Sequence, residues 1–424
     1  MARSEWRDTT VHTDVLVVGA GPAGLALTLM LLRSGVRVTL AERSTAFRRD
    51  FHGEILQPGG QLVLDQLGVL EGAERRGAHT LEGFQVVQGH RTLLDIDYRR
   101  LPAPHDRLLA LPQPHLLAEL LATCARLPGF TYLDGHRVSA LTEDDGRCTG
   151  AVVTRLGTRR VRVRASVVVG ADGRFSKTRK LAGIDAGRTD VFDQDVVWFT
   201  VPAPGRATGR VRIHRAGAAA VLVHDTHPDR LRIGWTLPHG SYNRVTAEGI
   251  AGIKRDLAAA LPAHADLLHE HLTGLGDLSL LDVFAANAPT WTRDGLVLLG
   301  DAAHTHGPLG AQGINLALQD AAVLHPVLVA ALAAGDVRRA RLVAFEQARR
   351  PVAEAVTRMQ RVQAKAFFGT GGRAAAFLRA RAAAVVTRTP VGARITSRIA
   401  YGRTPVQVHT DLFTAGAVPG ARAA

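Results

Sequence analysis

Three glycine-rich segments of this 424-residue sequence have the residue types and spacings of sites where the main chain itself binds a ligand. Each segment directly follows a short apolar run. Glycine at such a point lets a flat or anionic ligand lie against the backbone, which a fold alone rarely requires. The segments are GAGPAG at 19–24, GADG at 170–173 and GDAAHTHGPLGAQGIN at 300–315.

The first segment lies inside a predicted βαβ unit. Val15–Val18 is a continuous apolar run typical of a strand buried on both faces, residues 23–33 have helical character, and residues 36–41 predict a second strand. Glu42, at the end of that strand, can accept hydrogen bonds from ribose hydroxyls. With these elements around it and an acidic residue at this distance, GxGxxG indicates a dinucleotide site.

The residues of this cluster have separate tasks. Gly19 permits the tight turn, Gly21 lets the backbone approach a pyrophosphate, and Gly24 lets the helix pack close to the strand. Ala23 opens the helix, whose unpaired N–H groups and positive dipole end attract phosphates.

The second and third segments follow predicted strands at 167–169 and 296–299. Together, the three motifs resemble those of the FAD-dependent aromatic hydroxylases, the single-component flavin monooxygenases of the para-hydroxybenzoate hydroxylase type. The resemblance implies an α/β fold: a Rossmann-like FAD-binding domain with a parallel sheet, interleaved with an antiparallel-sheet substrate domain and followed by C-terminal helices. The expected boundaries are 1–81, 101–185 and 286–345 for the discontinuous FAD-binding domain, 82–100 and 186–285 for the substrate domain, and 346–424 for the C-terminal helical region.

The resemblance also implies which residues contact FAD. The ADP half would be held by Gly19, Gly21, Ala23, Gly24 and Glu42, with Arg43 beside the adenosine. Asp172 would lie near the pyrophosphate and the approach of NAD(P)H, Asp301 would bond ribityl or phosphate-linked oxygens, and Gln113 would face the cofactor. His52 stands where the family commonly has an arginine that touches the phosphates; it is either a weaker cofactor contact or a surface loop histidine.

The flavin ring would lie on the third segment. Pro308 and Gly310 would line the ring, and the main chain from Gly310 to Asn315, including Gly313 and Ile314, would present N–H groups to the N1/C2=O edge. Reduced flavin carries negative charge at that edge, so a helix N-terminus aimed there would stabilise it without a cationic side chain. No side chain is assigned a catalytic role, because the cofactor carries the hard chemistry.

The function implied by the resemblance is hydroxylation. An FAD-dependent monooxygenase of this type uses NADPH or NADH and O2 to hydroxylate an aromatic or polyketide-like small molecule through a flavin C4a-hydroperoxide. A halogenase, an epoxidase or a reductase on the same fold, or a non-catalytic FAD-binding protein, are the alternatives. In the substrate domain, alternating apolar and polar residues predict an antiparallel sheet that would roof the flavin. Candidates for its pocket face are Trp198, Phe199, His214, His224 and Trp235, with plain core packing as the alternative for each.

The sequence lacks the motifs of several other kinds of functional site. The only cysteines are Cys124 and Cys148, and neither HExxH nor a close His/Cys cluster occurs, so no metal site is expected. His304 and His306 either pack near the flavin or are structural loop residues. A GxSxG nucleophile motif is also absent. With no signal peptide and no uninterrupted apolar run of about 18 residues, we expect a cytoplasmic protein without a membrane span.

The net charge of +14 is concentrated near the C-terminus. Residues 336–403 contain fourteen arginines and one lysine against three acidic residues, and the arginines alternate with apolar residues at helical spacing. This pattern favours solvated helix faces and leaves open a weak contact with anionic lipid or an acidic partner, or a homodimer contact. No nucleic-acid-binding module accompanies the charge, so nucleic acid is not an expected partner.

Overall fold

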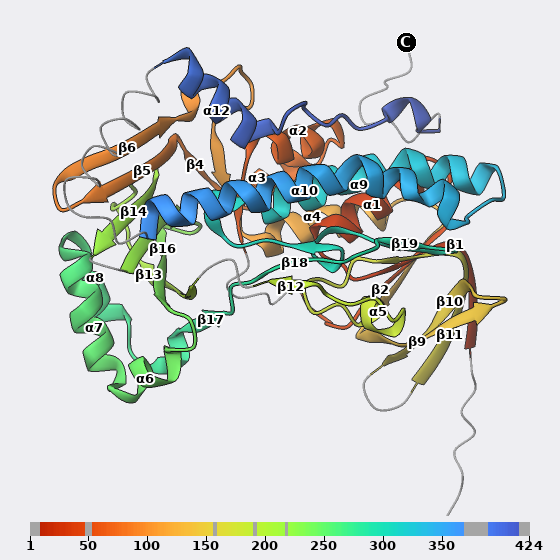
Figure 1. Ribbon diagram of the computed structural model, residues 1–424, viewed down its shortest axis with the longest axis horizontal. Coiled ribbons are helices and arrows are strands. Elements are labelled where there is room, and N and C mark those ends of the chain that lie inside the picture. Colours follow the sequence, from red (N-terminus) through yellow and green to blue (C-terminus); the bar gives the residue numbers. More distant parts are fainter. Residues whose placement is uncertain are drawn as a thin grey trace, which may run out of the picture.

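The computed structural model describes residues 9–46, 53–155, 159–189, 193–216, 219–368 and 389–414. Two large sheets lie toward opposite ends of an elongated molecule, and long helices run along it between them (Figure 1). The predicted α/β class is confirmed.

The first sheet carries all three glycine motifs at one edge. Its main path is β19 (Thr292–Arg293), β20 (Leu296–Leu298), β11 (Arg159–Gly170), β1 (Thr9–Val18), β2 (Val38–Glu42) and β8 (Phe130–Asp134), while β10 (Arg147–Arg155) pairs antiparallel with β11 and with β9 (His136–Asp144). The strands from β20 to β8 are parallel. Their register places Val18 beside Gly170 and Gly170 beside Leu298, so the three motifs begin where open α/β sheets bind ligands.

Helices pack around this sheet. They are α1 (Pro22–Arg33), α2 (Pro58–Gln66), α3 (Leu70–Arg75), α4 (Gln113–Cys124), α9 (Gly313–Ala333) and α10 (Arg339–Phe368). Figure 1 shows α9 packed between α1 and α10. The segment Leu309–Ala333 is long and apolar enough to cross a membrane, yet 61% of its most apolar window is buried inside the protein. Apolar residues all round a helix are typical of such a core position.

The second sheet has two different faces. Its order is β17 (Ser279–Leu281), β13 (Gln194–Pro202), β16 (Arg230–Pro238), β15 (Ala219–Thr226), β14 (Val211–Ala216), β5 (Gly83–Gln88) and β6 (Arg91–Asp97). One face packs on α7 (Gly249–Ala260) and α8 (Ala265–His271), which follow α6 (Tyr242–Ala247). The other face, which we call the inner face, contacts Leu309 and Ala311 of the third motif.

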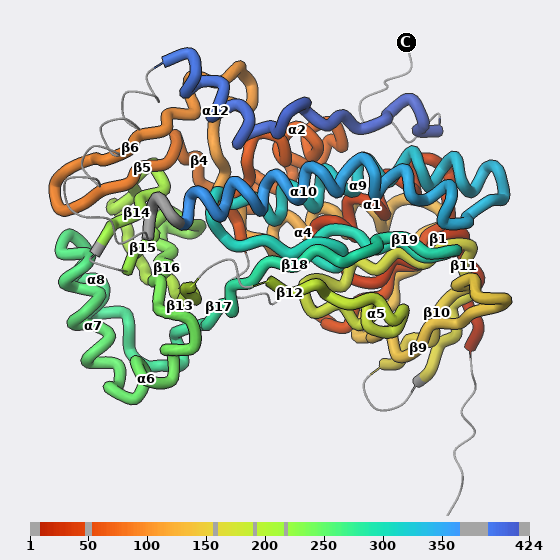
Figure 2. The backbone as a smooth tube through the Cα atoms, in the orientation of Figure 1, coloured from red at the N-terminus to blue at the C-terminus, as the bar shows by residue number. Residues whose placement is uncertain are grey.

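Short strands and one long helix connect the two sheets. Figure 2 shows β12 (Arg188–Thr189) and β18 (Ala285–Asn287) side by side between them, and β18 also pairs with β21 (His304–Thr305). A further small sheet joins β3 (Ile55–Leu56), β7 (Leu108–Ala110) and β4 (His79–Leu81). Helix α10 runs through the boundary proposed at 345/346 and reaches the second sheet, where Ala364 packs near Trp198.

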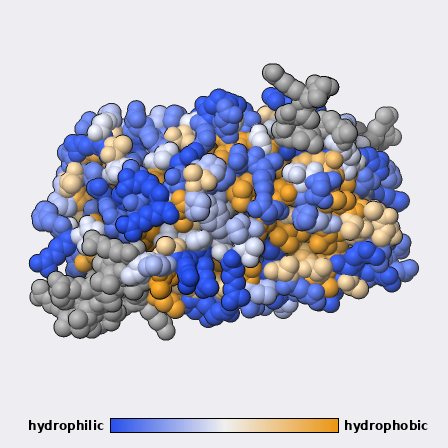
Figure 3. Space-filling model, turned by 90° about the horizontal axis from the view of Figure 1, so that it is seen from above, coloured by the Kyte–Doolittle hydropathy of each residue, from blue (hydrophilic) through white to orange (hydrophobic). Residues whose placement is uncertain are grey.

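The C-terminal arginines are not all solvated, contrary to the sequence pattern. Arg349 is 4% exposed and pairs with a buried aspartate, and Arg350 lies over the Trp291 ring. The face in Figure 3 is largely hydrophilic, with hydrophobic residues gathered in patches. Val391 and Ile395 of α12 (Pro390–Tyr401) are exposed; whether they form the homodimer contact stays a prediction.

Candidate functional site

The first two motifs press directly against each other. Ala171 N donates to Val18 O at 2.8 Å. Gly19 has a φ of +107°, and a Cβ there would lie 2.4 Å from Ala171 O. A Cβ on Gly24 would lie 2.0 Å from Gly19 O. Only glycine therefore fits at either position, and the turn is as tight as the sequence predicts.

Helix α1 begins on this turn with unpaired donors. Its N-cap, Gly21, gives no side-chain cap. The N–H groups of Ala23 and Gly24 have no acceptor among the residues that the structure describes. Unpaired N–H groups at a helix N-terminus suit an anionic ligand such as a pyrophosphate.

Glu42 is the last residue of β2, and its carboxylate also holds the glycine turn through hydrogen bonds. It is 3% exposed, and its carboxylate accepts the N–H of Ala20 at 2.7 Å and of Ser44 at 3.0 Å. Arg43 beside it is exposed. Glu42 therefore stands at the carboxyl end of β2, beside the glycine turn, where dinucleotide sites have their acidic residue.

The second motif is held by its own aspartate. Asp172 accepts hydrogen bonds from the Ser176 hydroxyl at 2.5 Å and from the N–H and hydroxyl of Thr178 at 2.9 and 3.0 Å, at the start of α5 (Lys177–Leu181). Its carboxylate is therefore directed toward α5. Within the described residues, the position of Asp172 favours shaping the loop over a direct contact with a ligand.

Arg179 joins the second motif to the third. It is 2% exposed and donates to Ala302 O at 2.8 Å and to Arg174 O at 3.1 Å. Burial lowers its pKa. Asp301 is half-buried, with its carboxylate 4.0 Å from Arg174 Nε. Sequence patterns give Arg179 no such cross-linking role, because nothing in their spacing reveals which carbonyls a buried guanidinium meets.

Side-chain amides fix the loop of the third motif. Pro308 precedes the turn η5 (Leu309–Ala311), in which Gly310 has a φ of +75°. Gln57 Nε2 donates to Gly310 O at 2.9 Å, and Gln57 N donates to Asn315 Oδ1 at 2.8 Å. Asn315 Nδ2 in turn donates to Ala311 O at 2.7 Å. Asn315 thus acts on the loop through its side chain, and Gln57 was not anticipated from the sequence.

These hydrogen bonds turn the carbonyls of Gly310 and Ala311 toward the protein, while several N–H groups of the loop stay unpaired within the described residues. The N–H groups of Gly310, Gly313 and Ile314 have no acceptor among the described residues. A Cβ on Gly313 would meet no atom within 4 Å, so there is open space in front of the N-terminus of α9. Space of this kind, bordered by a helix N-terminus, fits a flat ligand with an electron-rich edge.

Two predicted residues come from other segments. Gln113 is 6% exposed, donates to Gly53 O at 3.3 Å, and leaves its Oε1 without a hydrogen-bond partner in the described part of the chain. Such a buried polar atom is costly unless a ligand or water pairs with it. His52 lies outside the described residues.

The five candidates for the pocket face separate between the two faces of the second sheet. Phe199 and Trp235 pack in the core against α7 and α8. His214 lies on the same side, where burial, together with nearby His264, lowers its pKa. Trp198 and His224 lie on the inner face, because side chains alternate along a strand. A Cβ on Gly234, directly opposite Trp198, would lie 2.7 Å from the Trp198 ring.

A buried ion pair joins the inner face to the first half of the chain. Glu54, just before β3, accepts from Arg232 of β16 at 2.8 Å, and both side chains are less than a tenth exposed. Arg232 also lies 5.2 Å over the Trp198 ring, and His224 Nδ1 is 3.7 Å from Glu54. Burial lowers the pKa of His224.

The comparisons with known proteins agree with this geometry. The family model described as "FAD binding domain" matches residues 12–360. This chain is a member of the FAD-dependent monooxygenase family. The 6-methylpretetramide 4-monooxygenase of Streptomyces rimosus is 51% identical over 96% of this chain and 96% of its own.

Solved structures show the same fold. The family member matches PqsL of P. aeruginosa, solved in complex with 2-aminobenzoylacetate, with a TM-score of 0.76 and 24% identity over 89% of this chain and 100% of that one. It also matches the anhydrotetracycline hydroxylase OxyS of Streptomyces rimosus, with a TM-score of 0.72 and 26% identity over 92% of this chain and 76% of that one. The protein is an FAD-dependent monooxygenase, and the matches favour hydroxylation over the alternatives that the sequence left open.

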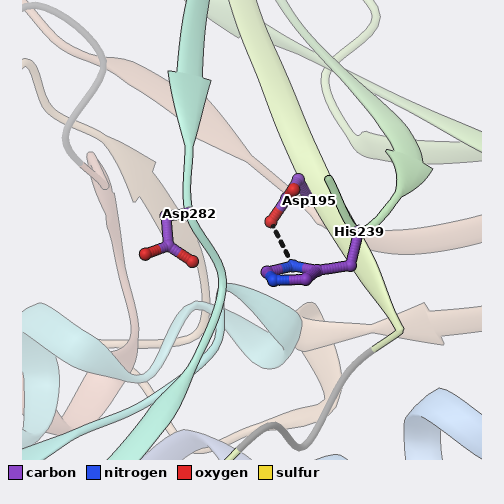
Figure 4. Close-up of side chains that lie close together, drawn as sticks. All are labelled: Asp195, His239 and Asp282. Carbon is purple, nitrogen blue, oxygen red and sulfur yellow. Dashed lines mark hydrogen bonds and ion pairs between the residues drawn. The ribbon is translucent and has the colours of Figure 1, made fainter. Parts of the chain in front are cut away.

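One group of side chains in this monooxygenase has the composition of a metal site. Asp195, His239 and Asp282 have ligand atoms within 4.8 Å of one another (Figure 4). However, Asp195 accepts from His239 Nδ1 at 2.9 Å, and Asp282 receives both nitrogens of the Arg188 fork at 3.0 Å. Both carboxylates already have hydrogen-bonding partners, and that of Asp282 is a guanidinium, so the group is better described as a polar cluster between the two sheets.

Two buried histidines predict that this enzyme loses stability in mild acid. Burial lowers the pKa of His306 from 6.5 to about 3 and that of His325 from 6.5 to about 4. Both stay neutral in the folded state, whereas the unfolded chain takes up their protons as the pH falls below 6.5. Stability is therefore complete above pH 6.5 and falls below it, by about 4 kcal/mol for the pair between pH 7 and pH 5.

Urea denaturation at pH 7, 6 and 5 measures this loss. His325→Gln is expected to remove about half of the difference. A free energy of unfolding that does not change over this range would contradict the assignment of neutral buried histidines.

Proposed function

We propose that this monooxygenase hydroxylates a flat polycyclic aromatic polyketide of the tetracycline type, such as 6-methylpretetramide. The observation that carries the proposal is 51% identity to the 6-methylpretetramide 4-monooxygenase over nearly the full length of both chains. O2 is the co-substrate, NADH or NADPH is the electron donor, and the reaction takes place in the cytoplasm.

In the proposed complex, bound FAD supplies oxygen transfer to an electron-rich ring carbon. The N–H groups of Ala23 and Gly24, with Gly19 and Gly21 in the turn, hold the pyrophosphate, and Glu42 and Arg43 hold the adenosine side. Asp301 and Gln113 contact the middle of the cofactor. These assignments are supported by the unpaired N–H groups and the unpaired Gln113 Oε1.

The third motif would hold the reactive end. Pro308 and Gly310 line the ring, and the N–H groups of Gly313 and Ile314 meet its electron-rich edge. The substrate lies between this loop and the inner face of the second sheet. Trp198 offers a flat aromatic surface there, and Leu309 and neighbouring apolar residues exclude water.

Turnover of 6-methylpretetramide tests the proposed function directly. The purified protein is expected to be yellow, and this substrate is expected to accelerate NAD(P)H oxidation while one atom of 18O2 enters the product. Mass spectrometry of the product reports the oxygen. NAD(P)H oxidation without labelled product would refute hydroxylation of this substrate. A simple phenol serves as the control, because it should accelerate oxidation less than the tetracyclic compound if the inner face recognises fused rings.

A further inference from the structure

A hydrogen-bonded chain of buried polar side chains passes through two histidines of the third motif. Asp320 of α9 is 2.6 Å from His304 Nε2 and accepts from Arg349 Nε at 2.6 Å. His304 Nδ1 is 3.1 Å from His306 Nε2, and His306 Nδ1 is 3.2 Å from the Thr357 hydroxyl. His304, Asp320 and Arg349 are each at most 4% exposed. The chain therefore runs from a fully buried carboxylate to a partly exposed hydroxyl on α10.

The carboxylate fixes the direction of the first hydrogen bond. Burial alone would raise the pKa of Asp320, but Arg349 and His304 outweigh it and lower that pKa to about 2. The ionised carboxylate can only accept, so His304 Nε2 must carry a proton. The open question is which of the two histidines supplies the proton in the bond between them.

Two arrangements satisfy that bond, and they differ by one proton. If His304 is doubly protonated, it donates to His306, His306 donates to Thr357, and Thr357 donates to Ala353 O at 3.2 Å. If His304 is neutral, His306 donates to it, Thr357 turns its proton to His306, and the Ala353 carbonyl loses this partner. Adding one proton reverses every bond between His304 and Thr357 without moving a heavy atom.

The histidine pair is coupled to the loop that faces the open space. Gly307, next to His306, donates to Gln360 Oε1 at 3.2 Å and accepts from Gln360 Nε2 at 2.8 Å. The same amide donates to Leu309 O at 2.7 Å. Gln360 and Thr357 are neighbours one turn apart on α10. The hydrogen bonds of Gln360 therefore connect the segment that holds His306 to Leu309 and to Gly310 beside it.

The two arrangements also differ in charge. Asp320 and Arg349 cancel, so the cluster has a net charge of +1 when His304 is doubly protonated and zero when it is neutral. Asp320 is seven residues along α9 from Gly313, or roughly 10 Å. Among the described residues, the Glu346–Arg350 ion pair of α10 is a further charged group near the histidine pair, beyond the Trp291 ring that lies 4.8 Å from His304. A positive charge on His304 would thus strengthen the positive end of α9.

We propose that His304 and His306 are proton-carrying positioning residues, which take up a proton through Thr357 when the ligand at the N-terminus of α9 becomes anionic. The ligand is the flavin of FAD, as the proposed function has it. The histidine pair would be in its neutral arrangement when the flavin ring is oxidised and neutral. It would be in its charged arrangement when the ring is reduced and anionic. The protein would then have a higher affinity for reduced FAD than for oxidised FAD, without any movement of the loop.

Titration of the apoprotein with FAD, oxidised and anaerobically reduced, tests the proposal without substrate. His306→Gln keeps a hydrogen-bonding side chain that cannot relay a proton. It is expected to lower the preference for reduced over oxidised FAD about tenfold, as a unit charge at this distance would. His325→Gln is the matched control, because His325 is equally buried on α9 and bonds only to Ser34 among the described residues. The His325→Gln variant should prefer reduced over oxidised FAD to the same extent as the wild type.

Thr357 gives a second, milder test. Thr357→Val removes the hydroxyl at nearly constant volume and should lower the preference in the same direction, and Thr357→Ser should restore it. Nitrogen-15 spectra of the histidine rings should show His304 gaining a proton when reduced FAD binds. An unchanged preference in both His306→Gln and Thr357→Val, or equal weakening of both redox forms, would overturn the proposal. Failure to hydroxylate 6-methylpretetramide would refute the proposed function but leave this result unaffected.

Discussion

Replacing Gly313 with valine should weaken FAD binding about 10- to 100-fold while the apoprotein stays as stable as the wild type. A Cβ at Gly313 meets no atom within 4 Å, and this glycine does not have a positive φ. Valine is therefore free of strain in the apoprotein, and the expected change in unfolding free energy is within about 0.5 kcal/mol. Its methyl groups would instead occupy the space that the proposed complex gives to the flavin edge at the N-terminus of α9, and overpacking of this kind costs about 1–3 kcal/mol.

Fluorescence titration with FAD and urea denaturation of the apoprotein measure the two quantities separately. Gly276→Val is the matched control, because a Cβ at Gly276 also meets no atom within 4 Å, at an exposed position between α8 and β17. Gly310→Val is less informative, since its φ of +75° strains valine in the apoprotein as well. Wild-type affinity in Gly313→Val would show that the ligand does not lie against α9.

The parallel sheet and the convergence of the glycine motifs could be predicted from the sequence. Short apolar runs followed by glycine are a strong local signal, and the carboxyl ends of parallel neighbouring strands must meet. The register of Val18, Gly170 and Leu298 follows from that constraint. The tight turn at Gly19 was predictable because its positive φ and the contact between Gly24 and Gly19 act within a few residues. The contact of Gly19 with Ala171 follows from the pairing of β1 with β11.

The side chains that hold the site could not be predicted, because their partners are distant in sequence. Gln57 acts on Gly310 and Asn315, more than 250 residues away. The direction of Asp172 toward α5 depends on rotamers that no spacing pattern encodes. Among the pocket candidates, strand alternation would have separated Trp198 from Phe199, but only the position of α7 and α8 shows which face is the inner one.

The largest stability effect is expected at the ion pair between Glu54 and Arg232. Both side chains are less than a tenth exposed, and the pair links the segment before β3 to β16 in the second sheet. Glu54→Gln removes the charge that neutralises a buried guanidinium stacked on Trp198. Removing one member of a buried pair typically costs about 3–5 kcal/mol, a large part of the stability of an ordinary protein.

The double variant Glu54→Leu with Arg232→Met distinguishes the effect of the unpaired charge on stability from the effect of lost packing. Apolar residues of similar size often replace a buried pair with little net change, so the double variant should be more stable than Glu54→Gln by several kcal/mol. Glu71→Gln, at an exposed pair with Arg75, should give no measurable change. Urea denaturation of the four proteins measures these differences. If Glu54→Gln were as stable as the wild type, the pair would not hold the second sheet against the FAD-binding half. If the double variant were no more stable than Glu54→Gln, the contribution would come from packing, and the charge of Arg232 would not be the reason for the loss.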